Sequence, residues 1–101
     1  MLSDIKFQTV TANGINLRLA MQGSGPLIVL CHGWPESWYS WRHQIPALAN
    51  AGYTAVAYDV RGYGESDKPY AIEAYTLKEL AADVLGISDA LGFDRFITIG
   101  H

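Results

Sequence analysis

The chain has 101 residues, so it can hold at most one small domain, and 50% of its residues are apolar. Seven Lys and Arg against ten Asp and Glu give a formal charge of −3, with no basic run or stripe. This balance argues against nucleic acid and anionic membranes as partners. No stretch is long enough to cross a membrane, and the N-terminus carries no signal-peptide pattern. The one cysteine, Cys31, has no disulfide partner within the chain, and these features together predict a cytoplasmic protein.

The first predicted element is a β-hairpin with strands at 5–11 and 15–22. Apolar and polar residues alternate along the second strand, which is typical of an antiparallel strand with one buried face. The turn between the strands contains Asn13-Gly14, and Asn-Gly is the strongest short hairpin signal because both residues tolerate positive φ. Residues 23–26 then lead into a strand of a different kind.

An unbroken apolar run from Leu27 to Cys31 follows and ends at the sequence His-Gly-Trp-Pro, residues 32–35. Such a run suits a strand buried on both faces, as in a parallel sheet covered by helices. In open α/β sheets the working groups lie just past the carboxyl ends of the strands, where these four residues fall. The Trp34–Pro35 bond is a candidate for cis, and the Trp34 backbone N–H is a candidate oxyanion-hole donor. Taken alone, the motif fits a plain strand-to-helix turn equally well.

Helices and strands are predicted in alternation after this motif. Large aromatic residues at 38–41 pack a loop or short turn over the sheet edge, and a helix covers 44–51, with its regular part beginning near Pro46. The second buried strand is 54–58, and the third is 95–99. Between them a capping box at 76–79 opens a helix that runs to about residue 91. Its apolar stripe is Leu77, Leu80, Ala81, Val84, Ile87 and Leu91.

The segment 59–66 contains two glycines in the pattern Gly-x-Gly but is a weak match to a nucleotide-binding loop. The third glycine of that fingerprint is missing, and no helix starts directly afterwards. A structural role fits better, in which Asp59, Arg61 and Ser66 tie the loop together by hydrogen bonds. His43 has neither an acidic partner nor a second ligand at metal spacing, so it is read as a surface or packing residue.

The predicted order is a β-hairpin followed by β-α-β-α-β, an α/β fold whose sheet begins antiparallel and becomes mostly parallel. The last strand leads into Gly100-His101, which matches the start of a nucleophile elbow, small-X-nucleophile-X-small. The nucleophile would then be the next residue. We therefore expect residues 1–101 to be the N-terminal portion of a single larger core domain, with strand 95–99 at its open edge.

The motifs after the three buried strands resemble those of the α/β-hydrolase fold family. Within it, His-Gly-Trp-Pro-Glu-Ser-Trp-Tyr-Ser-Trp-Arg at 32–42 and Arg-Gly-Tyr-Gly-Glu-Ser at 61–66 are similar to the soluble epoxide hydrolases. The resemblance covers nearly the whole chain and keeps order and spacing. Haloalkane and haloacid dehalogenases of this fold use related His-Gly-X-Pro loops, so they remain alternatives.

The resemblance implies conversion of epoxides to vicinal diols in two steps. An aspartate directly after His101 would attack an epoxide carbon and form an alkyl-enzyme ester, which water activated by a histidine and an acid would hydrolyse. Two tyrosines of a helical cap would protonate the leaving oxygen. These groups, the cap and the C-terminal half of the domain are absent from the chain, so the segment alone would lack the catalytic triad. The implied partners are an epoxide and water, with no cofactor and no metal, and a homodimer stays open.

The resemblance also assigns roles to residues of this chain. The backbone N–H of Trp34 would be one of the oxyanion-hole donors. The supporting residues, which would hold its loop or shape the elbow, are His32, Gly33, Pro35, Gly100 and His101. A serine in place of the aspartate would indicate an esterase, and a non-catalytic relative would use the pocket for binding alone. The close match at 32–42 argues against the non-catalytic alternative.

Overall fold

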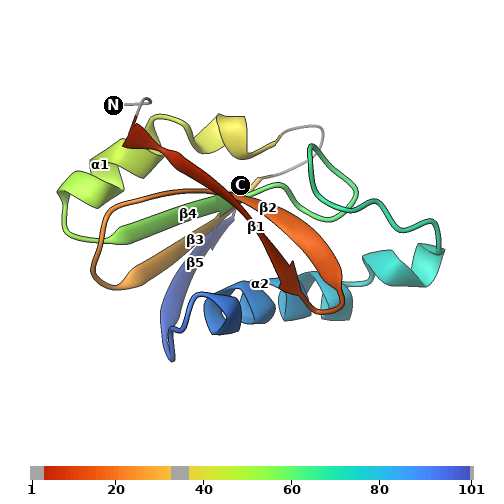
Figure 1. Cartoon of the computed structure of the whole chain (residues 1–101). Coiled ribbons are helices and arrows are strands. Elements are labelled where there is room, and N and C mark those ends of the chain that lie inside the picture. The colour runs from red at the N-terminus through yellow and green to blue at the C-terminus, as the bar shows by residue number, and fades with distance from the viewer. Residues whose placement is uncertain (1–3, 33–36, 101) are drawn as a thin grey trace.

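The computed structural model describes residues 4–32 and 37–100. It contains one five-stranded sheet with a helix on each side (Figure 1). The elements are β1 (Lys6–Ala12), β2 (Ile15–Gln22), β3 (Leu27–Cys31), the 3-10 turn η2 (Trp38–Trp41), α1 (Gln44–Asn50), β4 (Thr54–Tyr58), the 3-10 turn η3 (Ile72–Tyr75), α2 (Leu77–Ala90) and β5 (Phe96–Gly100).

The strand order across the sheet is β1-β2-β4-β3-β5. The pairs β1/β2 and β2/β4 are antiparallel, whereas β3/β4 and β3/β5 are parallel. The prediction of a sheet that begins antiparallel and becomes parallel is therefore confirmed, and so is the place of the last strand at a sheet edge. The carboxyl ends of β3, β4 and β5 consequently lie at the same end of the sheet.

The hairpin turn follows directly from the Asn-Gly pair. Asn13 and Gly14 have φ values of 52° and 79°, and Ala12 pairs with Ile15 across them. Two left-handed residues in succession match the right-handed twist of the flanking strands. The expectation of a single buried face on β2 is wrong at Ala20, which is fully buried and lies opposite Ala57 of β4. The reason is that β2 is an inner strand, and α1 packs over it as well as over β4.

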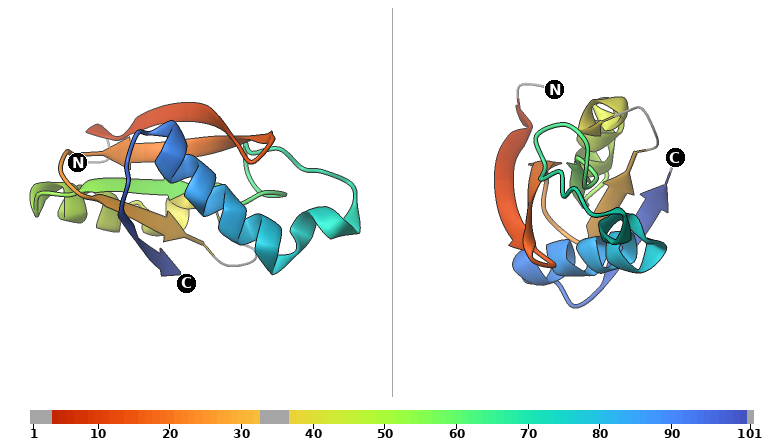
Figure 2. Two further views of the ribbon diagram at one scale, coloured as in Figure 1. Left: turned by 90° about the horizontal axis from the view of Figure 1, so that it is seen from below. Right: turned by 90° about the vertical axis from the view of Figure 1, so that its right-hand side faces the viewer.

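Alternate residues of the central strands feed two separate cores. One core contains Leu27, Val29 and Val56 and is closed by Ile87 of α2. The other contains Ile28, Leu30 and Ala57 and is closed by Ile45 of α1. The two helices lie on opposite sides of the sheet (Figure 2). A strand that is buried on both faces has a continuous run of apolar residues, which explains why β3 and β4 could be predicted from the sequence.

Two predicted helix features differ in the structure. Helix α1 begins at Gln44, two residues before Pro46, because the first N–H groups of a helix have no intrahelical acceptor and a proline there loses nothing. The prediction that the apolar stripe of α2 packs along its whole length is wrong at the N-terminal end, where Leu77 is 84% exposed and Ala81 is exposed. The C-terminal half of α2 packs closely against the hairpin, since a Cβ added at Gly86 would lie 2.8 Å from that of Ala12.

Strand β5 was predicted as a buried strand, and this is wrong. Ile97 and Ile99 are 54% and 39% exposed. The strand has β3 as its neighbour on one side only, because it forms the edge of the sheet within the described residues. Among these residues, no helix is long and apolar enough to cross a membrane.

Candidate functional site

A hollow of about 390 Å³ opens at the carboxyl ends of β3, β4 and β5, against the N-terminal half of α2. Its walls are mostly apolar, and it lies where open α/β sheets bind their ligands. The exposed N-terminal part of the apolar stripe of α2 therefore faces this hollow. The C-terminal part of the stripe packs into the core. The lining residues are Cys31, His32, Tyr58, Val60, Leu77, Leu80, Ala81, Val84, Thr98 and Gly100.

The polar groups on the sheet side of the hollow form a short chain of contacts. The Sγ of Cys31 lies 3.3 Å from Oη of Tyr58 and 3.8 Å from Oγ1 of Thr98. The Thr98 hydroxyl donates to the carbonyl of Val29 at 3.2 Å. Burial raises the pKa of Tyr58 above its ordinary value, and the neighbouring Cys31 adds to the shift. Tyr58 therefore stays an uncharged hydroxyl and contributes polarity without charge.

His32 is held against the loop that follows β4. Its side chain is buried, and its Nε2 accepts a hydrogen bond from the backbone N–H of Val60 at 3.0 Å. The ring also meets Tyr63 edge to face, with 5.0 Å between ring centroids. An N–H aimed at Nε2 requires that nitrogen to be unprotonated, so the geometry favours a holding role for His32 over proton transfer through this nitrogen.

Asp59 lies directly after β4 and organises the glycine-rich loop. Its carboxylate accepts hydrogen bonds from the backbone N–H of Trp38 and of Glu65, both at 2.9 Å. Its own carbonyl accepts from the Ser66 hydroxyl at 2.5 Å, and that hydroxyl accepts from the N–H of Arg18 at 2.9 Å. The predicted hydrogen-bonding roles of Asp59 and Ser66 in this loop are confirmed. Trp38 is a partner that the sequence did not indicate.

Arg61 was predicted to hold the glycine-rich loop together, and this is wrong. Its side chain instead contacts α2. Its guanidinium meets Asp83 in two hydrogen bonds, with 2.7 Å for Nε to Oδ2 and 2.7 Å for Nη2 to Oδ1. The carbonyl of Ala74 accepts from Nη1 at 2.6 Å, and Nδ2 of Asn13 donates to Asp83 at 3.1 Å. These bonds to Asp83 raise the pKa of Arg61. One signal for Asp83 was present in the sequence, because it interrupts the apolar stripe four residues before Ile87.

The predicted site residues fall into two groups. His32 and Gly100 are described and both line the hollow at the strand ends. A Cβ added at Gly100 would meet open space, so the described residues alone place no steric limit on that position. The other predicted residues lie outside the described ranges: Gly33, Trp34, Pro35 and His101. His43, read as surface or packing, is exposed just before α1.

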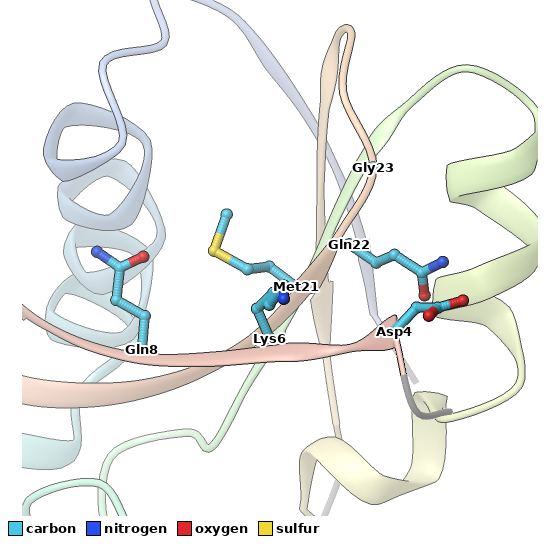
Figure 3. A pocket seen from close by; sticks show the side chains of 6 residues that line it. All are labelled: Asp4, Lys6, Gln8, Met21, Gln22 and Gly23. Atoms are coloured by element: carbon cyan, nitrogen blue, oxygen red, sulfur yellow. The ribbon is translucent and has the colours of Figure 1, made fainter. Parts of the chain in front are cut away.

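A second hollow, of about 400 Å³, lies on the hairpin. Figure 3 shows its lining side chains, with Gln8 and Met21 extending away from Asp4 and Gln22. Because these polar groups do not converge on one point, the hollow offers no arrangement for chemistry. Among residues 4–32 and 37–100, no three His, Cys, Asp or Glu side chains lie close enough to hold a metal ion.

Comparison with known proteins gives consistent matches. The family model described as alpha/beta hydrolase fold matches residues 26–101. The chain is 43% identical to epoxide hydrolase 2 of Siraitia grosvenorii over 100 residues, which is 99% of this chain and 32% of that protein. It is 60% identical to epoxide hydrolase B of Mycobacterium tuberculosis over 77 residues, 76% of this chain and 22% of that protein.

The structural match is equally close. The crystal structure of an epoxide hydrolase from Vigna radiata superposes with a TM-score of 0.96 at 44% identity, covering 100% of this chain and 33% of that chain. The chain thus spans about a third or less of the length of these relatives. With the family model matched over most of the sequence and the same strand order in space, the chain belongs to the α/β-hydrolase fold family.

Proposed function

We propose that this chain is the N-terminal portion of an epoxide hydrolase that converts epoxides to vicinal diols. The observation that carries the proposal is the 60% identity over 77 residues to a protein named epoxide hydrolase B. In the proposed reaction an aspartate directly after His101 is the nucleophile, and the enzyme needs neither a metal nor an organic cofactor. The rest of the core domain and the cap follow this chain in the complete protein.

The proposed roles of this chain's residues concern the walls of the site and its oxyanion hole. The apolar hollow beside α2 suits a small apolar substrate, and the side chains of Tyr58, Cys31 and Thr98 add a few polar groups to its wall. In the proposal the backbone N–H of Trp34 stabilises the oxyanion that forms when water attacks the ester. His32, Gly33 and Pro35 hold that loop, and Gly100 with His101 shapes the elbow. The proposed partners are an epoxide and water, the proposed location is cytoplasmic, and a homodimer is compatible with the proposal.

The covalent step can be followed by isotope labelling. The carboxylate oxygen bonds to the epoxide carbon as the epoxide C–O bond breaks, and the released oxygen takes a proton. Water then attacks the carboxyl carbon, so the diol leaves with an oxygen that came from the aspartate. In a single turnover of styrene oxide by the complete protein in H₂¹⁸O, we expect an unlabelled diol and ¹⁸O in the aspartate after His101. Treatment with a chelator should leave turnover unchanged.

The same measurements distinguish the alternatives. Label in the first-turnover diol would show direct attack by water and would contradict the ester mechanism. Halide release from a haloalkane without diol formation would indicate a dehalogenase. A burst of p-nitrophenol from an activated ester, with ¹⁸O in the released acid and the acyl group trapped on a serine, would indicate an esterase. Absence of diol from the folded complete protein would overturn the proposal.

A further inference from the structure

Strand β1 lies at the outer end of the sheet, with β2 on one side and none of the described elements on the other (Figure 2). It pairs with β2 over seven consecutive residues without a bulge, and it contains no proline. Its one charged residue, Lys6, is the first residue of the strand. Edge strands that are protected from other chains carry prolines, bulges or inward charges. The middle and the end of β1 carry none of these, so its edge is open to a further strand.

The backbone of β2 shows which groups of β1 are left over. The N–H of Asn16 donates to Oδ2 of Asp67 at 2.8 Å, and its carbonyl accepts from the N–H of Asp67 at 2.9 Å. The N–H of Arg18 donates to Oγ of Ser66 at 2.9 Å, and its carbonyl accepts from the N–H of Asp59 at 3.0 Å. Asn16 and Arg18 therefore turn their backbone groups away from β1.

The residues opposite them on β1 consequently point their own backbone groups out of the sheet. Thr11 lies opposite Asn16, and Thr9 lies opposite Arg18. Hydrogen-bonded and non-hydrogen-bonded pairs alternate along an antiparallel ladder, so Phe7 points outward as well. Among residues 4–32 and 37–100, the N–H and carbonyl groups of Phe7, Thr9 and Thr11 have no backbone partner. They form a row of donors and acceptors that another strand can pair with.

We propose that this edge binds a second copy of the chain, with the two β1 strands antiparallel about a two-fold axis at Thr9. In this register Thr9 faces Thr9 of the other copy, and Phe7 faces Thr11 of the other copy. Threonine pairs and pairs of an aromatic with a β-branched residue are both favourable across strands. Phe7 is 47% exposed in the single chain, so the pairing also covers apolar surface. Each contact occurs twice, as a two-fold interface requires.

The charges fit the same register. Lys6 lies on the α2 side of the sheet, as does Ala12, which is buried in the core on that side. Lys6 falls opposite Ala12 of the other copy, next to the hairpin turn, where Nδ2 of Asn13 donates to the carbonyl of Glu79 at 3.3 Å. The side chain of Glu79 is 36% exposed. A cation of one copy therefore lies near an anion of the other at both ends of the pair, and no like charges face each other along the strands.

The dimer is expected to be reversible, because a single pair of seven-residue strands is a small interface. The inference goes beyond the proposed function, since β1 contributes no residue to the hollow at the strand ends. Its test is therefore separate from any measurement of epoxide hydrolysis.

The first experiment is sedimentation equilibrium of the complete protein from about 1 μM to about 1 mM, the range of weak complexes. Thr9 is exposed, so Thr9→Lys and Thr9→Glu should both fold. Each places like charges at the two-fold axis, and we expect each to raise the dissociation constant of the dimer at least about tenfold. An equimolar mixture of the two variants is the matched control. Opposite charges then face each other, and association should return to the wild-type level.

The second experiment tests the register by cross-linking. The Cα atoms of the two Thr9 residues would lie about 5.5 Å apart, within the range that a disulfide spans. Thr11 lies four positions from Thr11 of the other copy, about 14 Å along the strand, which is too far. Under mild oxidation we expect Thr9→Cys to form a covalent dimer, and Thr11→Cys, the control, to stay uncross-linked.

Several outcomes would overturn the inference. Wild-type protein that stays monomeric over the whole concentration range would show that the edge binds no second copy. A dimer that persists unchanged in Thr9→Lys and Thr9→Glu would show that another surface is responsible. A mixture of the two variants that associates no better than either alone would contradict the two-fold axis at Thr9. Equal cross-linking of Thr9→Cys and Thr11→Cys would contradict the register.

Discussion

Two buried carboxylates, Asp59 and Asp83, are held in different ways. Asp83 is fully buried and faces the guanidinium of Arg61 in two hydrogen bonds of 2.7 Å. Asp59 is almost as buried, but its carboxylate accepts from the backbone N–H groups of Trp38 and Glu65. Asp83 therefore joins side chains of distant elements, whereas Asp59 joins stretches of backbone.

The difference determines which substitutions each site tolerates. A buried ion pair can be replaced as a unit by apolar side chains at little cost, although removing one partner leaves a buried charge behind. The partners of Asp59 belong to the main chain, and no substitution removes them except proline. The Asp83 ion pair can therefore be replaced by apolar side chains. The Asp59 carboxylate cannot, because its partners are backbone N–H groups.

The largest effect is expected from breaking the ion pair on one side. Arg61→Met in the complete protein should lower the free energy of unfolding by about 3–5 kcal/mol, because Asp83 is left charged and buried. The double variant Arg61→Met, Asp83→Leu should recover most of that loss. Urea unfolding of both variants measures the difference. A double variant as unstable as the single one would show that Asp83 is not held mainly by its charge partner.

Asp59→Asn sharpens the comparison, since the side chain is 2% exposed and its new amide group would face one of the two backbone N–H donors. The expected loss in the free energy of unfolding is about 1–3 kcal/mol, the cost of one unsatisfied buried group. No apolar partner substitution should restore it, in contrast to the Asp83 site. If Asp59→Leu proved as stable as the wild type in urea unfolding, the two sites would be equivalent and the distinction would fail.

A smaller effect is expected at the start of α2, the helix that carries Asp83. The Oγ1 of Thr76 caps this helix by accepting from the N–H of Glu79 at 3.3 Å. Thr76→Ala should cost about 1 kcal/mol, as is typical for a lost N-cap, and Thr76→Ser should be nearly neutral. Thermal unfolding compares the two. A Thr76→Ala variant that melts at the wild-type temperature would contradict the capping role of Thr76.

The smallest effect concerns Tyr58, the residue before Asp59. Its raised pKa means that the folded state keeps the phenol proton more firmly than the unfolded state does. The associated stability is complete below the ordinary pKa of about 10 and is lost as the pH rises above it. Tyr58→Phe should therefore show a shallower decline of Tm between about pH 9 and 11. Tyr70→Phe, at a fully exposed tyrosine, is the control and should follow the wild type. Identical declines in all three proteins would contradict the assignment.

The local signals in the sequence were sufficient for most of the fold. The hairpin, the continuous apolar runs of β3 and β4 and the capping box of α2 each depend on neighbours within a few residues, and each lies where it was predicted. The exposure of β5 and of Leu77 depends instead on what packs against them. An apolar strand at a sheet edge and one at its centre have the same composition, so their burial could not be read from the residues.

The candidate site was less predictable because its contacts join distant residues. The bond from Asn13 to Asp83 and the pairing of Arg61 with Asp83 span 70 and 22 residues of sequence. Nothing near Asp59 indicated that it would accept from Trp38, which lies 21 residues earlier. Motifs placed the site at the strand ends, but the choice of partners among buried polar groups follows from the three-dimensional packing.

The strand order also has a consequence for the nascent chain on the ribosome. Within residues 4–32 and 37–100, strand β3 pairs with β4 and β5, and both are synthesised after it. The residues that complete the β3/β4 ladder, Cys31 and Tyr58, are separated by 27 positions. At about 5–20 residues per second, five consecutive apolar or sulfur-bearing side chains stay without a partner strand for roughly 1–5 s of translation. During that interval β3 is an exposed apolar segment that a chaperone of unfolded chains would bind.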